Sequence, residues 1–323
     1  MDALAAYLEL CHSGRLRERT EAAVSLLESC SICPRGCGVN RLAGDAGKCS
    51  TARQAMVSSY GPHFGEEAPL VGRRGSGTIF FTNCNLRCLF CQNYSVSQLG
   101  GGEEVSKEEL ARIMLSLQAT GCHNINLVSP THVVPQILEA LELAVESGLY
   151  LPLVYNSGGY DSVETLRMLE GIVDVYMPDM KYDGEEIAGE LSGIEGYPAI
   201  NKAAIKEMHR QVGDLEIDEE GVARRGLLVR HLVLPHGLAG TKGIVDFLSK
   251  EISPGTYINI MAQYHPCHRA FQTPSLARRI SSTEFREALS LAREAGLSRL
   301  DGASSVEILP RDEIGANNDP WRR

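Results

Sequence analysis

The chain has 323 residues, 43% hydrophobic and 22% charged, as expected for a globular protein that buries a full core. Its formal net charge of −10 argues against a general nucleic-acid binder, which needs a basic face to neutralise phosphates. It contains no 18-residue apolar run and begins without a basic leader. We therefore expect no membrane span, no signal peptide and a cytoplasmic location.

The N-terminal part is predicted to be helical and then cysteine-rich. Apolar side chains recur at helical spacing over residues 1–28, which indicates two short helices. The next segment carries four cysteines at ligand-like spacing: Cys30, Cys33, Cys37 and Cys49. In a reducing compartment such a set favours a metal over disulfides, and four thiolates suit either zinc or an iron–sulfur cluster. Residues 50–76 are expected to be irregular or to form short strands, which completes an N-terminal segment over 1–76.

From Gly77 onward, short apolar runs alternate with helical patterns. The predicted strands are 78–82, 124–128, 151–155, 173–177, 227–234 and 256–261. The predicted helices are 106–120, 132–147, 161–170, 184–212, 239–251 and 282–295. This alternation indicates an α/β fold with a parallel sheet, and six units are too few for a closed eight-stranded barrel. We predict one such domain over 77–310 and a C-terminal tail over 311–323.

Three cysteines follow the first of these strands at the spacing C-x3-C-x2-C: Cys84, Cys88 and Cys91. Three thiolates are one short of a closed structural zinc site. They suit a [4Fe–4S] cluster with one iron left open for a substrate or a cofactor. The spacing therefore predicts a catalytic iron–sulfur cluster.

This loop resembles the signature of the radical SAM superfamily, and the run from Cys88 to Asn93 is similar to the loop of pyruvate formate-lyase activating enzymes. The resemblance implies a partial (β/α)6 barrel, a [4Fe–4S] cluster and S-adenosylmethionine (SAM), with Phe90 and Asn93 in the cofactor site. It implies reductive cleavage of SAM to a 5′-deoxyadenosyl radical, which abstracts hydrogen from a substrate carbon. A glycine of a partner protein would be one such substrate, and flavodoxin or ferredoxin would supply the electron.

The carboxyl ends of the next strands carry the other candidate cofactor residues, since active sites of parallel β/α folds lie there. Ser129 and Thr131 stand where activating enzymes have a Gly-Gly-Glu-Pro run, and their hydroxyls can accept from the SAM ammonium; Thr131 also suits a helix N-cap. Asn156 resembles the Asn-Gly turn that would contact the SAM ribose or carboxylate. Asp179 and Lys181 resemble an Asp-Leu-Lys run, with a surface salt bridge as the alternative.

The last two predicted strands add further candidates. The fifth is similar to the Arg-x-Val-Val-Pro strand of activating enzymes. The resemblance implies that the backbone near Leu232 flanks the adenine and that the His236 side chain faces the site. Arg230 either contributes to the cofactor site or braces the barrel. The sixth is followed by three residues that suit substrate contacts or, less well, a metal: His265, Cys267 and His268.

The sequence leaves other functions open. The same radical chemistry suits a small molecule or a peptide as substrate. A different class is a non-catalytic iron–sulfur or zinc protein for electron transfer or docking, although polar residues at the strand ends favour an enzyme.

Overall fold

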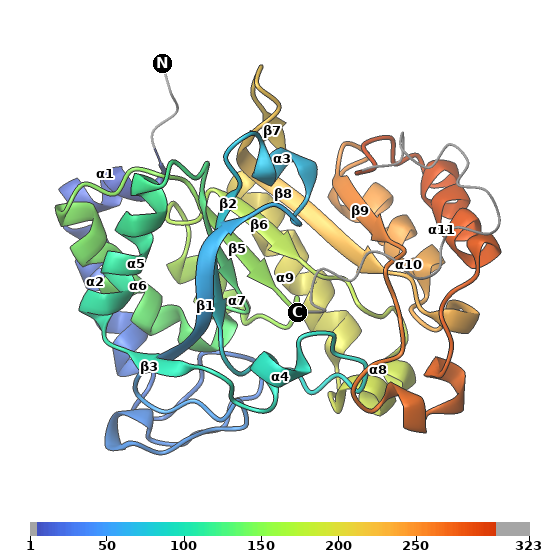
Figure 1. Cartoon of the computed structure of the whole chain (residues 1–323), viewed down its shortest axis with the longest axis horizontal. Coiled ribbons are helices and arrows are strands. Elements are labelled where there is room, and N and C mark those ends of the chain that lie inside the picture. The colour runs from blue at the N-terminus through green and yellow to red at the C-terminus, as the bar shows by residue number, and fades with distance from the viewer. Residues whose placement is uncertain (1–4, 302–323) are drawn as a thin grey trace.

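The computed structural model describes residues 5–301, and its centre is a nine-stranded sheet (Figure 1). Six strands pair in parallel in one continuous series: β2 (Ser76–Phe81), β4 (Ile125–Val128), β5 (Leu153–Ser157), β6 (Val175–Pro178), β8 (Ala223–Leu232) and β9 (Tyr257–Met261). The prediction of an α/β partial barrel with six parallel strands is confirmed. The predicted tail, 311–323, lies outside the described residues.

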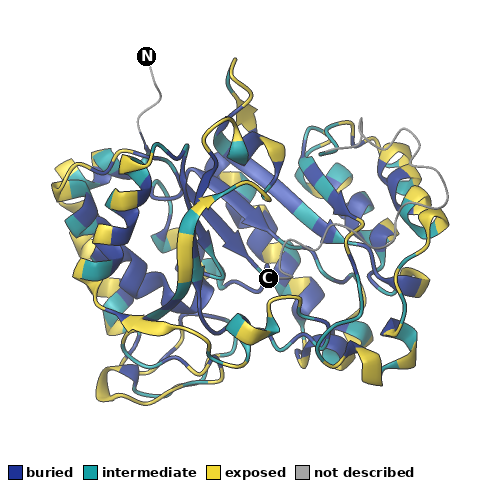
Figure 2. Cartoon of the chain, in the orientation of Figure 1, coloured by how far each residue is buried: buried dark blue, intermediate teal, exposed yellow. Residues whose placement is uncertain are grey.

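Helices cover the outer side of this sheet (Figure 1). They are α5 (Lys107–Ala119), α6 (Val134–Glu146), α7 (Val163–Met168), α9 (Tyr197–Val212), α10 (Thr241–Phe247) and α11 (Ser282–Glu294), and α1 (Tyr7–His12) and α2 (Arg15–Ser25) pack on α6. Two helices begin at residues whose side chains cap them: Ser106 is the N-cap of α5 and Ser281 is the N-cap of α11. Figure 2 shows the buried helix faces turned toward the strands.

The region 50–76 holds a longer strand than we expected. β1 (Ala55–His63) pairs antiparallel with β2, and β3 (Glu103–Val105) pairs with the first residues of β1. A second small addition, β7 (Glu216–Ile217), pairs with β8. The second half of β1 is largely exposed and contains Gly61 and Pro62, so it lacks the alternation of a half-buried strand.

The predicted helix over 184–212 is wrong as a single element. The structure has α8 (Glu185–Ser192), then a turn, then α9. Gly193 and Gly196 in the turn adopt left-handed φ angles of 63° and 74°. Glycine reaches this conformation without a steric penalty, so Gly193 ends α8 and the chain reverses toward α9.

The bottom of the barrel is apolar. Leu70, from the short helix α3 (Ala68–Val71), packs inside the barrel against a buried cluster that includes Val154, Val175 and Leu228. This plug leaves the carboxyl ends of the strands as the polar end of the barrel. Among the described residues, no helix is long and apolar enough to cross a membrane.

Candidate active site

The loop after β2 carries three free thiols with polar neighbours. Cys84 Sγ accepts from the Leu86 backbone N–H at 3.4 Å, and Cys88 Sγ accepts from Ser192 Oγ at 3.0 Å. Cys91 Sγ lies 3.1 Å from Ser97 Oγ of α4 (Tyr94–Ser97). The predicted cluster ligands therefore share one loop, and each sulfur has a polar neighbour.

The electrostatics of this loop suit a bound metal group. Burial raises the pKa of Cys84 to about 12 and also raises that of Cys88, while the nearby Lys181 ammonium opposes both shifts. Metal ligands must be deprotonated, so a group of positive charge is needed to hold these buried sulfurs as thiolates. The three thiols and the cation beside them fit an iron–sulfur cluster.

Aromatic packing fixes the loop. The Phe90 ring meets Tyr182 and Tyr264 edge-on, at centroid distances of 6.3 and 5.9 Å. Phe90 is buried, so its ring supports the loop from the core side, whereas Asn93 is exposed at the start of α4.

The segment after β9 lies against the same loop. Cys267 Sγ donates to the Phe90 carbonyl at 3.2 Å, and the Arg269 backbone N–H donates to the Leu89 carbonyl. The His268 ring stacks on Tyr94 at 4.8 Å. All three candidates on this segment therefore contact the cluster loop or α4 beside it, since His265 Nδ1 lies 3.4 Å from Gln92 Nε2.

A charged network joins the ends of β5, β6 and β8. Asp179 accepts from Lys181 Nζ at 2.5 Å and from Arg230 Nε at 2.9 Å, and Arg230 Nη2 donates to Asn156 Oδ1 at 2.7 Å. The side chains of Asp179 and Lys181 are only 14% and 20% exposed. Burial raises the pKa of Asp179, but the two cations outweigh it and the net pKa is lowered. Asp179, Lys181 and Arg230 thus form a largely buried ion network beside the cysteines.

Helix α9 braces these strand ends. Tyr197 donates its hydroxyl to the Gly158 carbonyl, and Asn201 donates to the carbonyls of Gly159 and Asp179. Gly159 has a φ of 72°, and a Cβ there would lie 2.1 Å from the Asp179 carbonyl oxygen. The Gly-Gly pair in the sequence therefore reflects close approach of two strand-end loops.

The loop after β4 turns one of its hydroxyls inward. Thr131 Oγ1 donates to Asp161 Oδ1 at 2.6 Å, and Asp161 also accepts from Ser157 and Tyr155. Ser129 has a φ of 58° and donates its backbone N–H to the Asn156 carbonyl. Asp161 was missed from the sequence, since a buried carboxylate that accepts hydroxyls from β5 and from the loop after β4 leaves no local signature.

The two candidates on the fifth predicted strand differ in position. Leu232 is half-buried in β8 and pairs with Met261 of β9. His236 is exposed, and its backbone N–H donates to Glu284 at the start of α11. The His236 ring lies 3.4 Å from Arg278 Nη2, whereas Arg230 is part of the Asp179 network.

The four N-terminal cysteines come together. They line one small cavity with the side chains of Arg41 and His132, directly behind the cluster loop. The sequence-predicted second ligand set is therefore contiguous in space.

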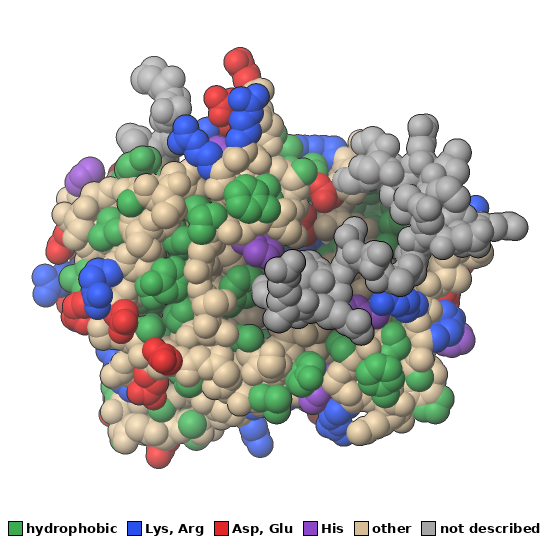
Figure 3. All heavy atoms as spheres, viewed as in Figure 1, with side chains coloured by type: hydrophobic (Ala, Val, Ile, Leu, Met, Phe, Trp, Pro, Cys, Tyr) green, Lys and Arg blue, Asp and Glu red, His purple; other side chains and the backbone are tan. Residues whose placement is uncertain are grey.

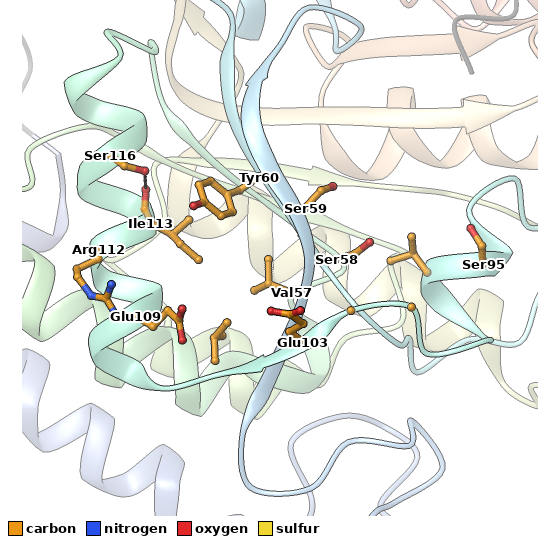
Figure 4. Close-up of a pocket in the computed structure, with 14 residues that line it drawn as sticks. Val57, Ser58, Ser59, Tyr60, Ser95, Glu103, Glu109, Arg112, Ile113 and Ser116 are labelled. Atoms are coloured by element: carbon orange, nitrogen blue, oxygen red, sulfur yellow. Dashed lines mark hydrogen bonds between the residues drawn. The ribbon is translucent and has the colours of Figure 1, made fainter. Parts of the chain in front are cut away.

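A separate cavity of about 1060 Å³ lies outside the barrel (Figure 4). Its walls are β1, α5, the segment Gly101–Glu103 and α4, with Tyr60, Ile113 and Ser95 pointing into it. Figure 3 shows hydrophobic side chains over this face and acidic side chains near β3. The cavity is a surface groove rather than part of the strand-end site.

Comparison with known proteins agrees with this site. The family model described as Radical SAM superfamily matches residues 78–215, from β2 to the end of α9 and slightly beyond. The chain therefore contains a radical SAM superfamily domain over these residues. Among its relatives is the uncharacterized protein MJ0674 of Methanocaldococcus jannaschii, 32% identical over 300 residues, covering 90% of this chain and 82% of the relative.

Two solved structures are also similar. A radical SAM methyltransferase from Sphaerobacter thermophilus has 14% identity and a TM-score of 0.49, covering 71% of this chain and 67% of that one. The FeFe-hydrogenase maturase HydG from Carboxydothermus hydrogenoformans has 15% identity and a TM-score of 0.44, covering 68% of this chain and 50% of that one.

Proposed function

We propose that this protein is a radical SAM enzyme that cleaves SAM reductively and abstracts a hydrogen atom from a substrate carbon. Together, the [4Fe–4S] cluster and SAM implied by the family supply a 5′-deoxyadenosyl radical. The single observation that carries the proposal is the position of Lys181, whose ammonium acts on both Cys84 and Cys88 while Asp179 holds it. This places a fixed cation beside the predicted cluster ligands.

The chain's own residues have distinct roles in this proposal. Lys181 binds the carboxylate of SAM, and Asp179 keeps the ammonium in place. The Asn156 Oδ1 atom accepts a hydrogen bond from Arg230, so the Asn156 Nδ2 group remains available to donate to the cofactor. Backbone at Ser129 and Leu232 lines the same end of the barrel, and the segment after β9 excludes water by covering Phe90 and Tyr94.

The test is replacement of one cluster ligand. Cys88→Ala should abolish 5′-deoxyadenosine formation in anaerobic protein supplied with iron, sulfide, SAM and a reductant, because the loop then keeps only two of its three predicted cluster ligands. Cys11→Ala, on α1 and outside both cysteine sets, is the matched control and should retain it. Wild-type levels of 5′-deoxyadenosine from Cys88→Ala would show that the ligand assignment is wrong.

For the substrate, we propose a backbone glycine of a partner protein, with flavodoxin or ferredoxin as reductant. The activating-enzyme-like loop supports this, and so does the groove beside β1. In the described part of the chain, β3 covers only Ala55–Val57, so the outer edge of residues 58–63 has no strand beside it. An extended segment can pair with such an edge, within reach of α4 and the cluster loop.

This substrate has its own test. A protein with a glycyl-radical loop, encoded next to this gene, is mixed anaerobically with the loaded enzyme. A glycyl EPR signal that needs SAM and Cys88 supports the proposal, whereas 5′-deoxyadenosine formation without any protein radical contradicts it.

One observation favours a small polar molecule as the alternative substrate. Asn126 of β4 is fully buried with neither amide atom bonded among the described residues, and the buried Glu67 has one free carboxylate oxygen. Buried polar atoms without partners are costly, so they suit a polar ligand inside the barrel. If a small polar substrate labelled with deuterium is supplied and the deuterium is found in the 5′-deoxyadenosine product, that result would support this alternative.

We also propose a cytoplasmic location. All ten cysteines are free in the structure, although several lie close together in space. Thiols persist in this form where the compartment is reducing.

A further inference from the structure

The N-terminal cysteines form a compact set whose backbone is fixed by its own turns. Cys30, Cys33 and Cys49 are buried, whereas Cys37 is half-buried and reaches the surface. Hydrogen bonds from the Gly38 N–H to the Cys30 carbonyl, and from the Gly36 N–H to the Cys33 carbonyl, fold the loop back on itself. The four thiols thereby line one cavity.

A buried cation without a counter-charge lies in the same cavity. Arg41 is fully buried; its Nη1 donates to the His132 carbonyl at 2.8 Å and lies 3.9 Å from Cys30 Sγ. Its Nη2 has no partner, and among the described residues no carboxylate pairs with this guanidinium. Arginine stays charged in proteins, and an unpaired buried charge is strongly destabilising. Four thiolates around a metal would supply the missing negative charge.

The cavity is directly connected to the loop of the SAM site. Arg35, which lies between Cys33 and Cys37 in the sequence, donates its Nε to the Asn85 carbonyl at 2.9 Å. The Oδ1 atom of the same Asn85 lies 3.8 Å from Cys84 Sγ. The segment that carries the four thiols therefore contacts the SAM loop at the residue next to Cys84.

Four thiolates suit either one zinc ion or an iron–sulfur cluster. Their contact with the SAM loop through Arg35 and Asn85 favours a cluster, because zinc has no redox role there, whereas a cluster can exchange electrons with its neighbour.

We propose that Cys30, Cys33, Cys37 and Cys49 ligate a second iron–sulfur cluster, that Arg41 is its buried counter-ion, and that this cluster passes electrons to the SAM cluster. A low-potential one-electron donor, a flavin or an iron–sulfur protein, is oxidised at the Cys37 side and the second cluster is reduced. The second cluster returns to its oxidised state when the electron leaves past Asn85. Only the recipient in this scheme rests on the proposed function.

The first experiment isolates the second cluster from the SAM site. A variant with Cys84→Ala, Cys88→Ala and Cys91→Ala, purified anaerobically, should retain about four irons and a cluster absorption and EPR spectrum. Adding Cys33→Ser should remove them, whereas adding Cys11→Ser should not. About one zinc and no iron in the triple variant, or no metal at all, would overturn the proposal without bearing on the proposed SAM cluster, whose ligands this variant lacks.

The second experiment addresses the counter-ion. In the triple variant, Arg41→Met removes the charge and keeps an apolar stem, so the reduction potential of the remaining cluster should fall or the cluster should be lost. Arg41→Lys keeps a cation and should restore the cluster. An unchanged potential in Arg41→Met would show that the guanidinium does not face the cluster charge.

The third experiment measures electron delivery in otherwise wild-type protein. In stopped-flow mixing with reduced flavodoxin, Cys33→Ser should reduce its SAM cluster at least tenfold more slowly than wild type, while dithionite still supports 5′-deoxyadenosine formation. Cys11→Ser, on α1 and outside both cysteine sets, serves as the folded control and should keep the wild-type rate. Equal rates in wild type and Cys33→Ser would overturn the relay.

Discussion

Asp179 shows how one carboxylate holds two cations at the polar end of the barrel. Lys181 and Arg230 come from different positions along the chain and both bind Asp179, while a third residue, Asn156, orients Arg230 from β5. The sequence predicted Asp179, Lys181 and Asn156 from their places after strands. It did not predict that Arg230 links them, because that contact spans 51 to 74 residues.

Replacing Asp179 should weaken SAM binding. Asp179→Asn keeps the shape of the side chain but leaves Lys181 and Arg230 without their shared charge, so the Lys181 ammonium should lose its fixed position. We expect the SAM dissociation constant to rise tenfold to a hundredfold, or about 1–3 kcal/mol, as measured by equilibrium dialysis on loaded protein.

A matched control exists on the outer surface. Asp183 pairs with Lys202 at 2.7 Å, with both side chains 33% exposed, so Asp183→Asn should leave SAM affinity unchanged. Equal SAM affinities for Asp179→Asn and wild type would show that the Asp179 network stabilises the barrel and does not contribute to SAM binding.

At the scale of elements, a buried carboxylate ties α1 to the bottom of the barrel. Asp174, just before β6, accepts from the Ala6 N–H at 2.9 Å and from the Leu153 N–H at 2.8 Å. Burial raises its pKa to about 6, although these two hydrogen bonds oppose the shift. The docking of the first helix on the barrel is therefore coupled to a titrating group.

The sign of the resulting pH dependence follows from the raised pKa. The folded state holds the Asp174 proton more tightly than the unfolded state, so this group's stabilisation is present at low pH and is lost as pH rises through 6. Between pH 5 and pH 7 the wild type should lose about 1.4 kcal/mol of unfolding free energy relative to Asp174→Asn.

Anaerobic urea unfolding of both proteins at several pH values measures this difference. Asp174→Asn should be less stable overall, because its amide cannot accept from both N–H groups. A difference between the two proteins that stays constant with pH would contradict the titration of Asp174.

At the scale of the whole molecule, periodicity was enough to predict six parallel strands and the end of the barrel that carries the site. Each predicted strand overlaps an observed one because it is a buried apolar run. β1 and the break between α8 and α9 needed tertiary information. Residues 58–63 of β1 are largely exposed and, within the described range 5–301, have no strand on their outer side, and Gly193 is compatible with a helix until the chain must turn. Nothing in the sequence indicated that the two cysteine sets are connected through Asn85.

The uncovered edge of β1, residues 58–63, leads to a prediction about where a partner protein docks. If a partner protein pairs with β1, Tyr60→Glu should weaken it, because Tyr60 is 53% exposed and lines the groove, and a new charge would join the acids near β3. We expect radical formation on the partner to fall at least tenfold by EPR, with SAM cleavage in the absence of partner unchanged. Tyr150→Glu is the matched control, since Tyr150 is 58% exposed but follows α6 and lines a different cavity, beside Arg73 and His123. If the two variants lose partner activation equally, or neither loses it, the groove beside β1 is not the docking surface, and the small-molecule substrate inside the barrel becomes the better supported alternative.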